Sequence, residues 1–90
     1  MQTDFDHVEI DNRVFGAAPR KHAIDRAVRD AFAHVRGEWR IVVSEVTHFS
    51  PPWWWVSIEG GGKWLEMSLR PWEQEADVLR DRLMEAVHRR

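Results

Sequence analysis

The sequence lacks cysteine, an excess of positive charge, and any apolar run close to the roughly 20 residues of a membrane-spanning helix. Without cysteine, a disulfide framework and a cysteine-based zinc site are excluded. The first residues, MQTDFDHVEIDN, are acidic and lack the basic and apolar blocks of a secretory signal, so we expect a cytoplasmic protein with no membrane partner. A net charge of −2 disfavours nucleic acid as a partner of the whole molecule.

The remaining composition is that of one small folded domain. Apolar residues make up 43% and charged residues 31% of the 90 residues, which is typical of a globular chain rather than a disordered one. A chain of this length buries about 60% of its unfolded surface, which suffices for a single core. We therefore predict one domain over residues 1–90, with residues 1–18 as an N-terminal arm or a short edge strand.

Two segments have the periodicity of amphipathic helices. Apolar residues recur every three or four positions between Pro19, which suits a first helical turn, and Gly37, which suits a helix end. A second helix is predicted from Pro71 onward, because acidic residues in its first turns and basic residues in its last complement the helix dipole. The apolar stripe of this second helix consists of Trp72, Ala76, Leu79, Leu83 and Ala86 or Val87.

Three segments between the helices predict β-strands, at residues 38–49, 53–59 and 63–69. The apolar face of the first strand changes near Ser44, which predicts a bulge or a strand buried on both sides. The GGG sequence suits a tight hairpin turn between the other two strands. The order α-β-β-β-α predicts an α+β domain, in which a three-stranded antiparallel sheet carries both helices on one face and the N-terminal segment adds an arm or a further strand.

Four of the six tryptophans fall in SPPWWWVSIEGGGKW, from Ser50 to Trp64. Neighbouring side chains of a strand point to opposite faces, so the three consecutive tryptophans cannot all enter one core. The period of two assigns to the core Trp54, Val56, Ile58, Leu65, Met67 and Leu69, together with Ile41 and Val43. We call the opposite side of the last two strands the tryptophan face, which consists of Trp53, Trp55, Ser57, Glu59, Trp64, Glu66 and Ser68.

The tryptophan face is predicted to be aromatic at one end and polar at the other, with Trp55 and Trp64 as cross-strand or diagonal neighbours. Several tryptophans exposed together form a patch that is large for a monomer, so we expect it to be covered. One candidate cover is a second copy of the chain, and another is a different ligand such as a peptide, a sugar or a base. The third is the N-terminal arm, through Phe5, Val8, Ile10, Val14 and Phe15.

Two charge patterns are candidate sites. His7, Glu9 and Asp11 alternate along one face of a possible strand, a spacing that a divalent ion accepts but that is commoner on a solvated surface. On the first helix, His22, Arg26, Arg29 and Arg36 lie at i, i+4, i+7 and i+14, opposite the apolar stripe, and we call them the basic ridge. A basic ridge suits a helix that follows phosphates, although Asp25 and Asp30 flank this one.

No catalytic constellation is present in the sequence. No serine lies in a nucleophile elbow, and no histidine and aspartate have the spacing of a catalytic pair. The GGGK sequence is not a phosphate loop, because Lys63 begins a strand and not a helix. We therefore expect no enzyme activity, no cofactor and no bound metal.

The α-β-β-β-α order, over about residues 19–88, resembles the double-stranded-RNA-binding domain. The first helix, the long first strand, the proline-containing loop HFSPPW and the glycine turn fall where that family has them. The resemblance implies that the first helix and this loop contact minor grooves of RNA. That family has a lysine cluster at the start of its last helix, whereas this chain reads RPWEQEAD there, with Arg70 as the single basic residue. The pattern is also similar to short bacterial domains of unknown function.

These observations predict a small binding or adaptor domain without catalysis. It would act through Trp53, Trp55 and Trp64, on a protein partner or on a second copy of itself. The alternative is nucleic-acid binding through the basic ridge.

Overall fold

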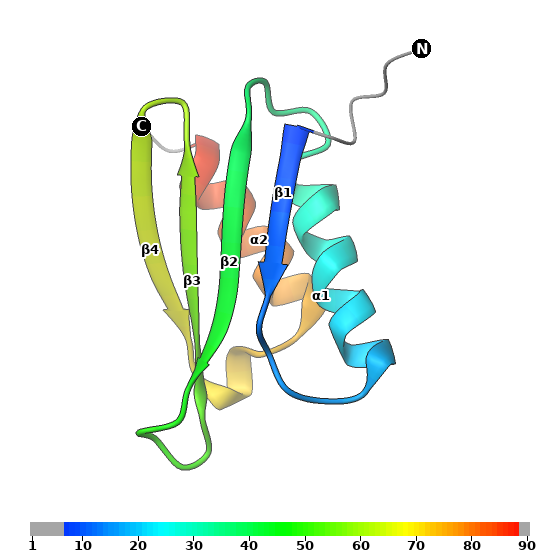
Figure 1. Ribbon diagram of the computed structural model, residues 1–90, viewed down its shortest axis with the longest axis vertical. Coiled ribbons are helices and arrows are strands. Elements are labelled where there is room, and N and C mark those ends of the chain that lie inside the picture. Colours follow the sequence, from blue (N-terminus) through cyan, green and yellow to red (C-terminus); the bar gives the residue numbers. More distant parts are fainter. Residues whose placement is uncertain (1–6, 89–90) are drawn as a thin grey trace.

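A four-stranded sheet and two helices form the protein in the computed structural model, which describes residues 7–88 (Figure 1). The strands lie in the order β1-β2-β3-β4, with β1 parallel to β2 and the other pairs antiparallel. This arrangement confirms the α+β class and assigns residues 8–12 of the N-terminal segment to an edge strand. The elements are β1 (Val8–Asn12), α1 (Ala18–Ala31), β2 (Trp39–Val46), β3 (Trp53–Gly60), β4 (Lys63–Leu69), the short 3-10 helix η2 (Pro71–Glu73) and α2 (Ala76–His88).

Both helices lie on the same face of the sheet, behind the strands in Figure 1. The parallel pair β1 and β2 is joined by α1, as parallel strands require a crossover connection. The second helix follows β4 and packs beside α1. No helix within residues 7–88 has the length and apolar character needed to cross a membrane.

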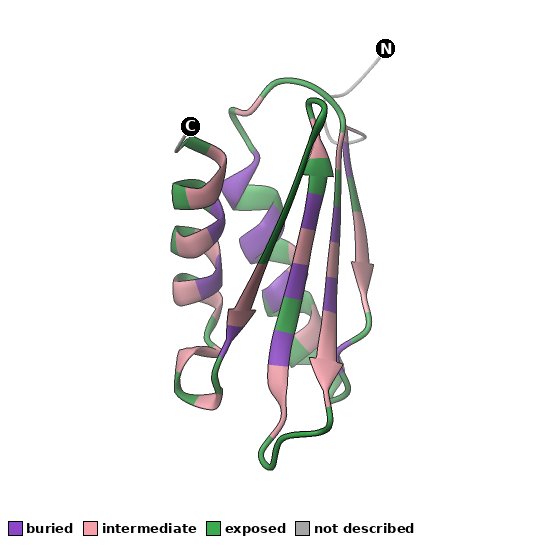
Figure 2. Ribbon diagram, turned by 90° about the vertical axis from the view of Figure 1, so that its left-hand side faces the viewer, coloured by how far each residue is buried: buried purple, intermediate pink, exposed green. Residues whose placement is uncertain are grey.

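The core lies between the sheet and the helices. The predicted alternation is confirmed for β3, since Trp54, Val56 and Ile58 are buried and face the helices. On β4 it is confirmed fully only at Leu69, because Met67 is half-buried and Leu65 is 37% exposed (Figure 2). The reason is that β4 is an edge strand, so its side chains have neighbouring strand residues on one side only. The other buried residues are Val8, Val14, Ile24, Ala27, Val28, Ala31, Phe32, Ile41, Val43, Leu79 and Leu83.

The first helix is shorter than its periodicity predicts. Its expected end at Gly37 is wrong, because the helix ends at Ala31 and Phe32 caps it with φ −105° and ψ 9°. The buried ring of Phe32 lies 5.3 Å from the ring of Trp39, and this packing turns the chain toward β2. Gly37 instead has a φ of +96° in the turn that leads into β2.

The second strand pairs with β3 without interruption. The predicted bulge near Ser44 is wrong, since each residue from Trp39 to Val46 has one partner in β3. The strand also ends at Val46 and not at residue 49. Val46 pairs with Trp53 on the face away from the helices, which explains the change of apolar face that the sequence displays.

The last helix is interrupted near its predicted start. After η2, Gln74 donates from Nε2 to the carbonyls of Pro52 at 2.9 Å and Leu69 at 3.2 Å, and α2 begins only at Ala76. The placement of Trp72 in the apolar stripe is wrong, because Trp72 precedes this break and is 71% exposed. The rest of the stripe packs on the core as predicted, through Ala76, Leu79, Leu83, Ala86 and Val87.

Candidate functional site

The tryptophan face is the side of the sheet opposite the helices. Trp53, Trp55 and Trp64 all lie on it, since each alternates with a residue that faces the helices. Trp64 is 67% exposed and Trp55 is 39% exposed, whereas Trp53 is half-buried. Within residues 7–88, no element crosses this face, which is turned toward the viewer in Figure 1.

Trp55 and Trp64 are not neighbours, so their predicted contact is wrong. Trp55 lies opposite Ser68, while Trp64 lies opposite Glu59, beside the hairpin turn. The two-residue turn fixes this register, which places Trp64 four positions along β4 from the partner of Trp55. The aromatic side chains therefore lie toward both ends of the face, with polar residues between them.

Both exposed indoles are held on the face by hydrogen bonds. Nε1 of Trp55 donates to Oε2 of Glu66 at 3.4 Å, and Nε1 of Trp64 donates to Oγ of Ser57 at 3.1 Å. Because Ser57 and Glu66 lie directly opposite each other, the two rings approach one central pair from its two sides. A side chain that is already held loses less conformational entropy when a ligand binds. The face is therefore preorganised for contact through its rings.

An aromatic stack lies next to the tryptophan face, at the start of β3 and past the end of β4. The rings of Phe49 and Trp53 stack with centroids 4.4 Å apart. The guanidinium carbon of Arg70 lies 5.3 Å from the Trp53 ring centre and 5.6 Å from that of Trp72. We call these four residues the aromatic stack. Each exposed cation–π contact of this kind contributes about 0.5–1 kcal/mol, which orders the stack without burying it.

The aromatic stack was not predicted from the sequence. The sequence predicts Phe49 at the end of a strand and Trp72 in the apolar stripe of a helix, whereas Phe49 and Arg70 lie in connecting segments and Trp72 lies in η2. The sequence gives one indication of the stack, which is an aromatic residue beside each reversal of the chain, in HFSPPW and in RPW.

The predicted cover by the N-terminal arm is wrong for the part of the arm that lies within residues 7–88. β1 pairs with β2 at the edge of the sheet farthest from β4, and Val8 and Val14 are buried in the core on the helix side. Ile10 packs against the same core, and Phe15 is 73% exposed. Phe5 lies outside the described residues.

The structure brings together three of the four residues of the basic ridge. His22, Arg26 and Arg29 lie on α1 and line one hollow of about 510 Å³. Arg36 lies beyond the end of the helix, where its carbonyl accepts a hydrogen bond from Nε1 of Trp39 at 2.8 Å. The ridge is therefore shorter than predicted, because α1 ends early. The hollow is also lined by His7, Val8, Asp25, Asp30 and Ala33.

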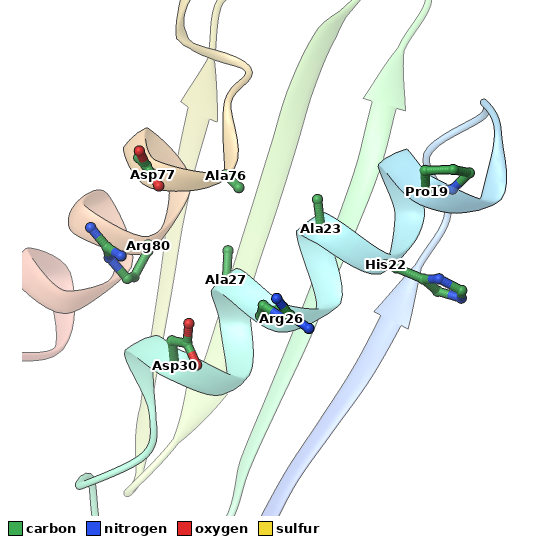
Figure 3. Close-up of a pocket in the computed structure, with 9 residues that line it drawn as sticks. All are labelled: Pro19, His22, Ala23, Arg26, Ala27, Asp30, Ala76, Asp77 and Arg80. Atoms are coloured by element: carbon green, nitrogen blue, oxygen red, sulfur yellow. The ribbon is translucent and has the colours of Figure 1, made fainter.

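A second hollow, of about 420 Å³, lies between the two helices on the side away from the sheet (Figure 3). The small side chains of Ala23 and Ala27 on α1 and of Ala76 on α2 leave this space open. Two arginines and two aspartates surround it, so its charge is balanced and favours neither an anion nor a cation. These four residues are Arg26, Asp30, Asp77 and Arg80.

His7, Glu9 and Asp11 are not brought together as metal ligands. The His7 Nε2 atom lies 3.1 Å from the carbonyl oxygen of Phe32, on the helix side. Glu9 and Asp11 form ion pairs with Arg40, each at 3.8 Å. The described part of the chain contains no group of three or more histidine, aspartate or glutamate residues placed to hold a metal ion.

Asp11 is further engaged by Arg13, whose Nη2 donates to its Oδ2 at 2.7 Å. This hydrogen bond holds the pKa of the Asp11 carboxyl below its ordinary value. A carboxylate paired with two guanidinium groups is an ion-pair partner and not a general acid or base near neutral pH.

No protein-family model matches the chain, and neither a curated protein nor a solved structure is significantly similar to it.

Proposed function

We propose that the protein is a non-catalytic binding domain that recruits a protein partner through the tryptophan face. The observation that carries this proposal is the pair of exposed indoles of Trp55 and Trp64, each held by a hydrogen bond on a face that no described element covers. Tryptophan is among the residues that contribute most to protein interfaces, because a rigid ring buries a large area at low entropic cost.

The charge of the tryptophan face favours a partner segment that carries arginine or lysine. Glu66 lies between the two indoles, and Glu59 lies opposite Trp64. Both carboxylates and the electron-rich ring faces attract cations. The same carboxylates repel phosphate groups, which argues for a protein ligand rather than a nucleic acid on this face.

The test compares four immobilised proteins: wild type, Trp55→Ala, Trp64→Ala and Trp72→Ala. Trp72 is the matched control, since it is as exposed as Trp64 but lies outside the tryptophan face. A candidate partner retained by wild type is purified, and its affinity for each protein is measured by calorimetry. We expect Trp64→Ala and Trp55→Ala to weaken binding at least tenfold and Trp72→Ala to leave it within about threefold.

Equal affinity for all four proteins would overturn the proposal. Circular dichroism of each variant separates lost binding from lost folding. If Trp55→Ala unfolds the protein, then Trp55 stabilises the fold and is not a free contact residue, and Trp64→Ala alone decides the question.

Nucleic-acid binding through the basic ridge is a second candidate. One observation favours it: Arg26 and Arg29 line the same hollow, and neither forms an ion pair with another of residues 7–88. Unpaired guanidinium groups are available to phosphates. Against it, Asp25 and Asp30 line the same hollow, and the molecule as a whole is acidic.

A further inference from the structure

β4 forms an open edge of the sheet. Within residues 7–88 it pairs with β3 alone, over the seven residues Lys63–Leu69. A two-residue turn is closed by the hydrogen-bonded pair Gly60 and Lys63, and such pairs alternate along an antiparallel ladder. The N–H and C=O groups of Trp64, Glu66 and Ser68 therefore point away from β3. An edge of this kind is a template for a further strand.

The two edges of the sheet differ in how they are protected. β1 has five residues, and its outward Glu9 and Asp11 are ion-paired with arginines. β4 is longer, its register with β3 is unbroken, and apolar side chains are exposed on both of its faces. Leu65 is partly exposed on the helix side, and Trp64 is largely exposed on the other. Edge strands that avoid pairing usually carry proline, bulges or several charges, whereas β4 has neither a proline nor a bulge, and its two charged residues, Lys63 and Glu66, are of opposite sign.

We propose that two copies of the chain pair β4 with β4, antiparallel, about a two-fold axis at Met67, to form one continuous eight-stranded sheet. In this register the outward N–H and C=O groups of Glu66 in one copy form hydrogen bonds with those of Ser68 in the other. On the helix side, Met67 meets Met67, and Leu65 meets Leu69. The exposed apolar atoms of the edge are thus covered by their own equivalents, which is the self-complementarity that a two-fold interface requires.

Charge disfavours one neighbouring register. An axis at Glu66 would place two Glu66 carboxylates directly opposite each other, which is destabilising. An axis at Met67 leaves no like charges directly opposite and places Arg70 of one copy opposite the exposed ring of Trp64 in the other. An arginine across a tryptophan gives a favourable cation–π contact. The occupant that matches this edge in pattern and charge is therefore a second copy of the chain.

This pairing goes beyond the proposed function, because it uses the edge of β4 and does not require a ligand on the tryptophan face. It also has a consequence for that function. Two tryptophan faces would lie side by side on the same surface of one continuous sheet. A partner with two binding segments would then bind with higher avidity than a partner with one.

Single-cysteine variants test the register directly, because the chain has no cysteine of its own. Met67 and its equivalent would form a non-hydrogen-bonded pair, in which Cα atoms are about 4.5 Å apart, a distance that a disulfide spans. Met67→Cys is therefore expected to form a covalent dimer under mild oxidation at low protein concentration. Leu65→Cys is the matched control: it is on the same face and more exposed, but its equivalent would lie four residues away along the strand, about 13 Å.

We expect Met67→Cys to cross-link at least tenfold faster than Leu65→Cys. Faster cross-linking of Leu65→Cys, or equal rates, would overturn the proposed register. Because Met67 is half-buried, circular dichroism of the reduced variant checks that it folds.

Light scattering over a concentration series supplies a second test that needs no cysteine. We expect wild type to dimerise, Leu65→Lys to raise the dimer dissociation constant at least tenfold, and Trp55→Ala to leave it within threefold. A wild type that stays monomeric at millimolar concentration would overturn the edge pairing and leave the proposed function standing. A dimer that is lost in Trp55→Ala and kept in Leu65→Lys would also overturn it, in favour of association through the tryptophan face.

Discussion

At the scale of single residues, the three consecutive tryptophans have three different environments. Trp54 is buried among core residues, Trp53 is held in the aromatic stack, and Trp55 is partly exposed on the tryptophan face. The three residues are of the same type, so their environments differ because side chains alternate along a strand and because the two faces of the strand are covered differently. A substitution at each of these positions is therefore expected to have a different effect.

Burial and hydrogen bonding conflict at Trp54. Its ring is fully buried, with the Arg20 guanidinium carbon 5.3 Å from the ring centre, yet its Nε1 has no hydrogen-bond partner among the described residues. An unsatisfied buried donor costs about 1–3 kcal/mol. Trp54→Phe removes that donor and keeps most of the ring, so we expect the free energy of unfolding in urea to fall by less than about 1.5 kcal/mol. Trp54→Ala leaves a cavity and is expected to cost about 3–5 kcal/mol.

Similar losses for Trp54→Phe and Trp54→Ala would contradict this account, since the indole N–H would then contribute as much as the ring. Trp64→Phe is the control on the exposed face. It is expected to change the unfolding free energy by less than about 0.5 kcal/mol, because surface substitutions of this size have little effect.

At the scale of elements, the glycine hairpin has two distinct requirements. Gly61 and Gly62 have φ values of +58° and +75°, which a type I′ turn needs. Gly60 is needed for space, because a Cβ there would lie 2.5 Å from the Trp39 ring and 2.7 Å from the carbonyl of Glu38. The run of three glycines therefore combines a turn with a close approach of an indole to the backbone.

Gly60→Ala and Gly62→Asn separate these two requirements. Gly60→Ala forces the Trp39 ring or the Glu38 backbone to move, so we expect it to lower the unfolding free energy by about 1–3 kcal/mol. Asparagine tolerates a positive φ, and nothing lies within 4 Å of a Cβ at Gly62, so Gly62→Asn is expected to cost less than about 0.5 kcal/mol. Urea denaturation measures both variants. Equal costs would show that the indole yields without strain.

The faces of the strands were predictable from the sequence, and the ends of the helices were not. A period of two assigned Trp54, Val56 and Ile58 to the core because it depends only on neighbouring positions. The end of α1 depends on Phe32 packing against Trp39, and the start of α2 depends on Gln74 donating to the carbonyl of Leu69 and to that of Pro52, which lies before β3. Contacts of this kind leave no local pattern in a sequence.

The same distinction applies to the candidate site. The residues of the tryptophan face followed from alternation, but the separation of Trp55 and Trp64 followed from the register that the hairpin turn sets. The aromatic stack joins two connecting segments, and only the folded chain brings them together. Sequence patterns thus indicated which face to examine, while the arrangement on that face required the structure.

At the scale of the whole molecule, the sheet has two unequal faces. Two helices cover one face, and the other carries exposed tryptophans together with the carboxylates of Glu59 and Glu66. Three residues of the basic ridge, His22, Arg26 and Arg29, lie on α1, which packs on the face of the sheet opposite the tryptophan face. Protein binding and nucleic-acid binding would therefore use separate surfaces, which makes the two candidate functions separable by experiment.

The net charge of −2 argues against binding of nucleic acid by the molecule as a whole. Asp25 and Asp30 also reduce the positive potential beside Arg26 and Arg29. We expect fluorescence anisotropy of a labelled duplex RNA or duplex DNA to stay flat on titration with the protein at low salt. This condition is the most permissive one, because phosphate contacts weaken steeply as salt rises.

Arg29→Glu and Arg80→Glu interpret the titration if a signal appears. Both substitutions change the charge by the same amount, but only Arg29 belongs to the basic ridge, whereas Arg80 lies on α2 beside Asp81. Binding that falls with salt and is weakened at least tenfold more by Arg29→Glu than by Arg80→Glu would make the ridge a phosphate-binding surface. Nucleic-acid binding would then displace protein binding as the leading function. Equal weakening by both substitutions would indicate attraction by overall charge, and the tryptophan face would keep its place as the surface on which this domain acts.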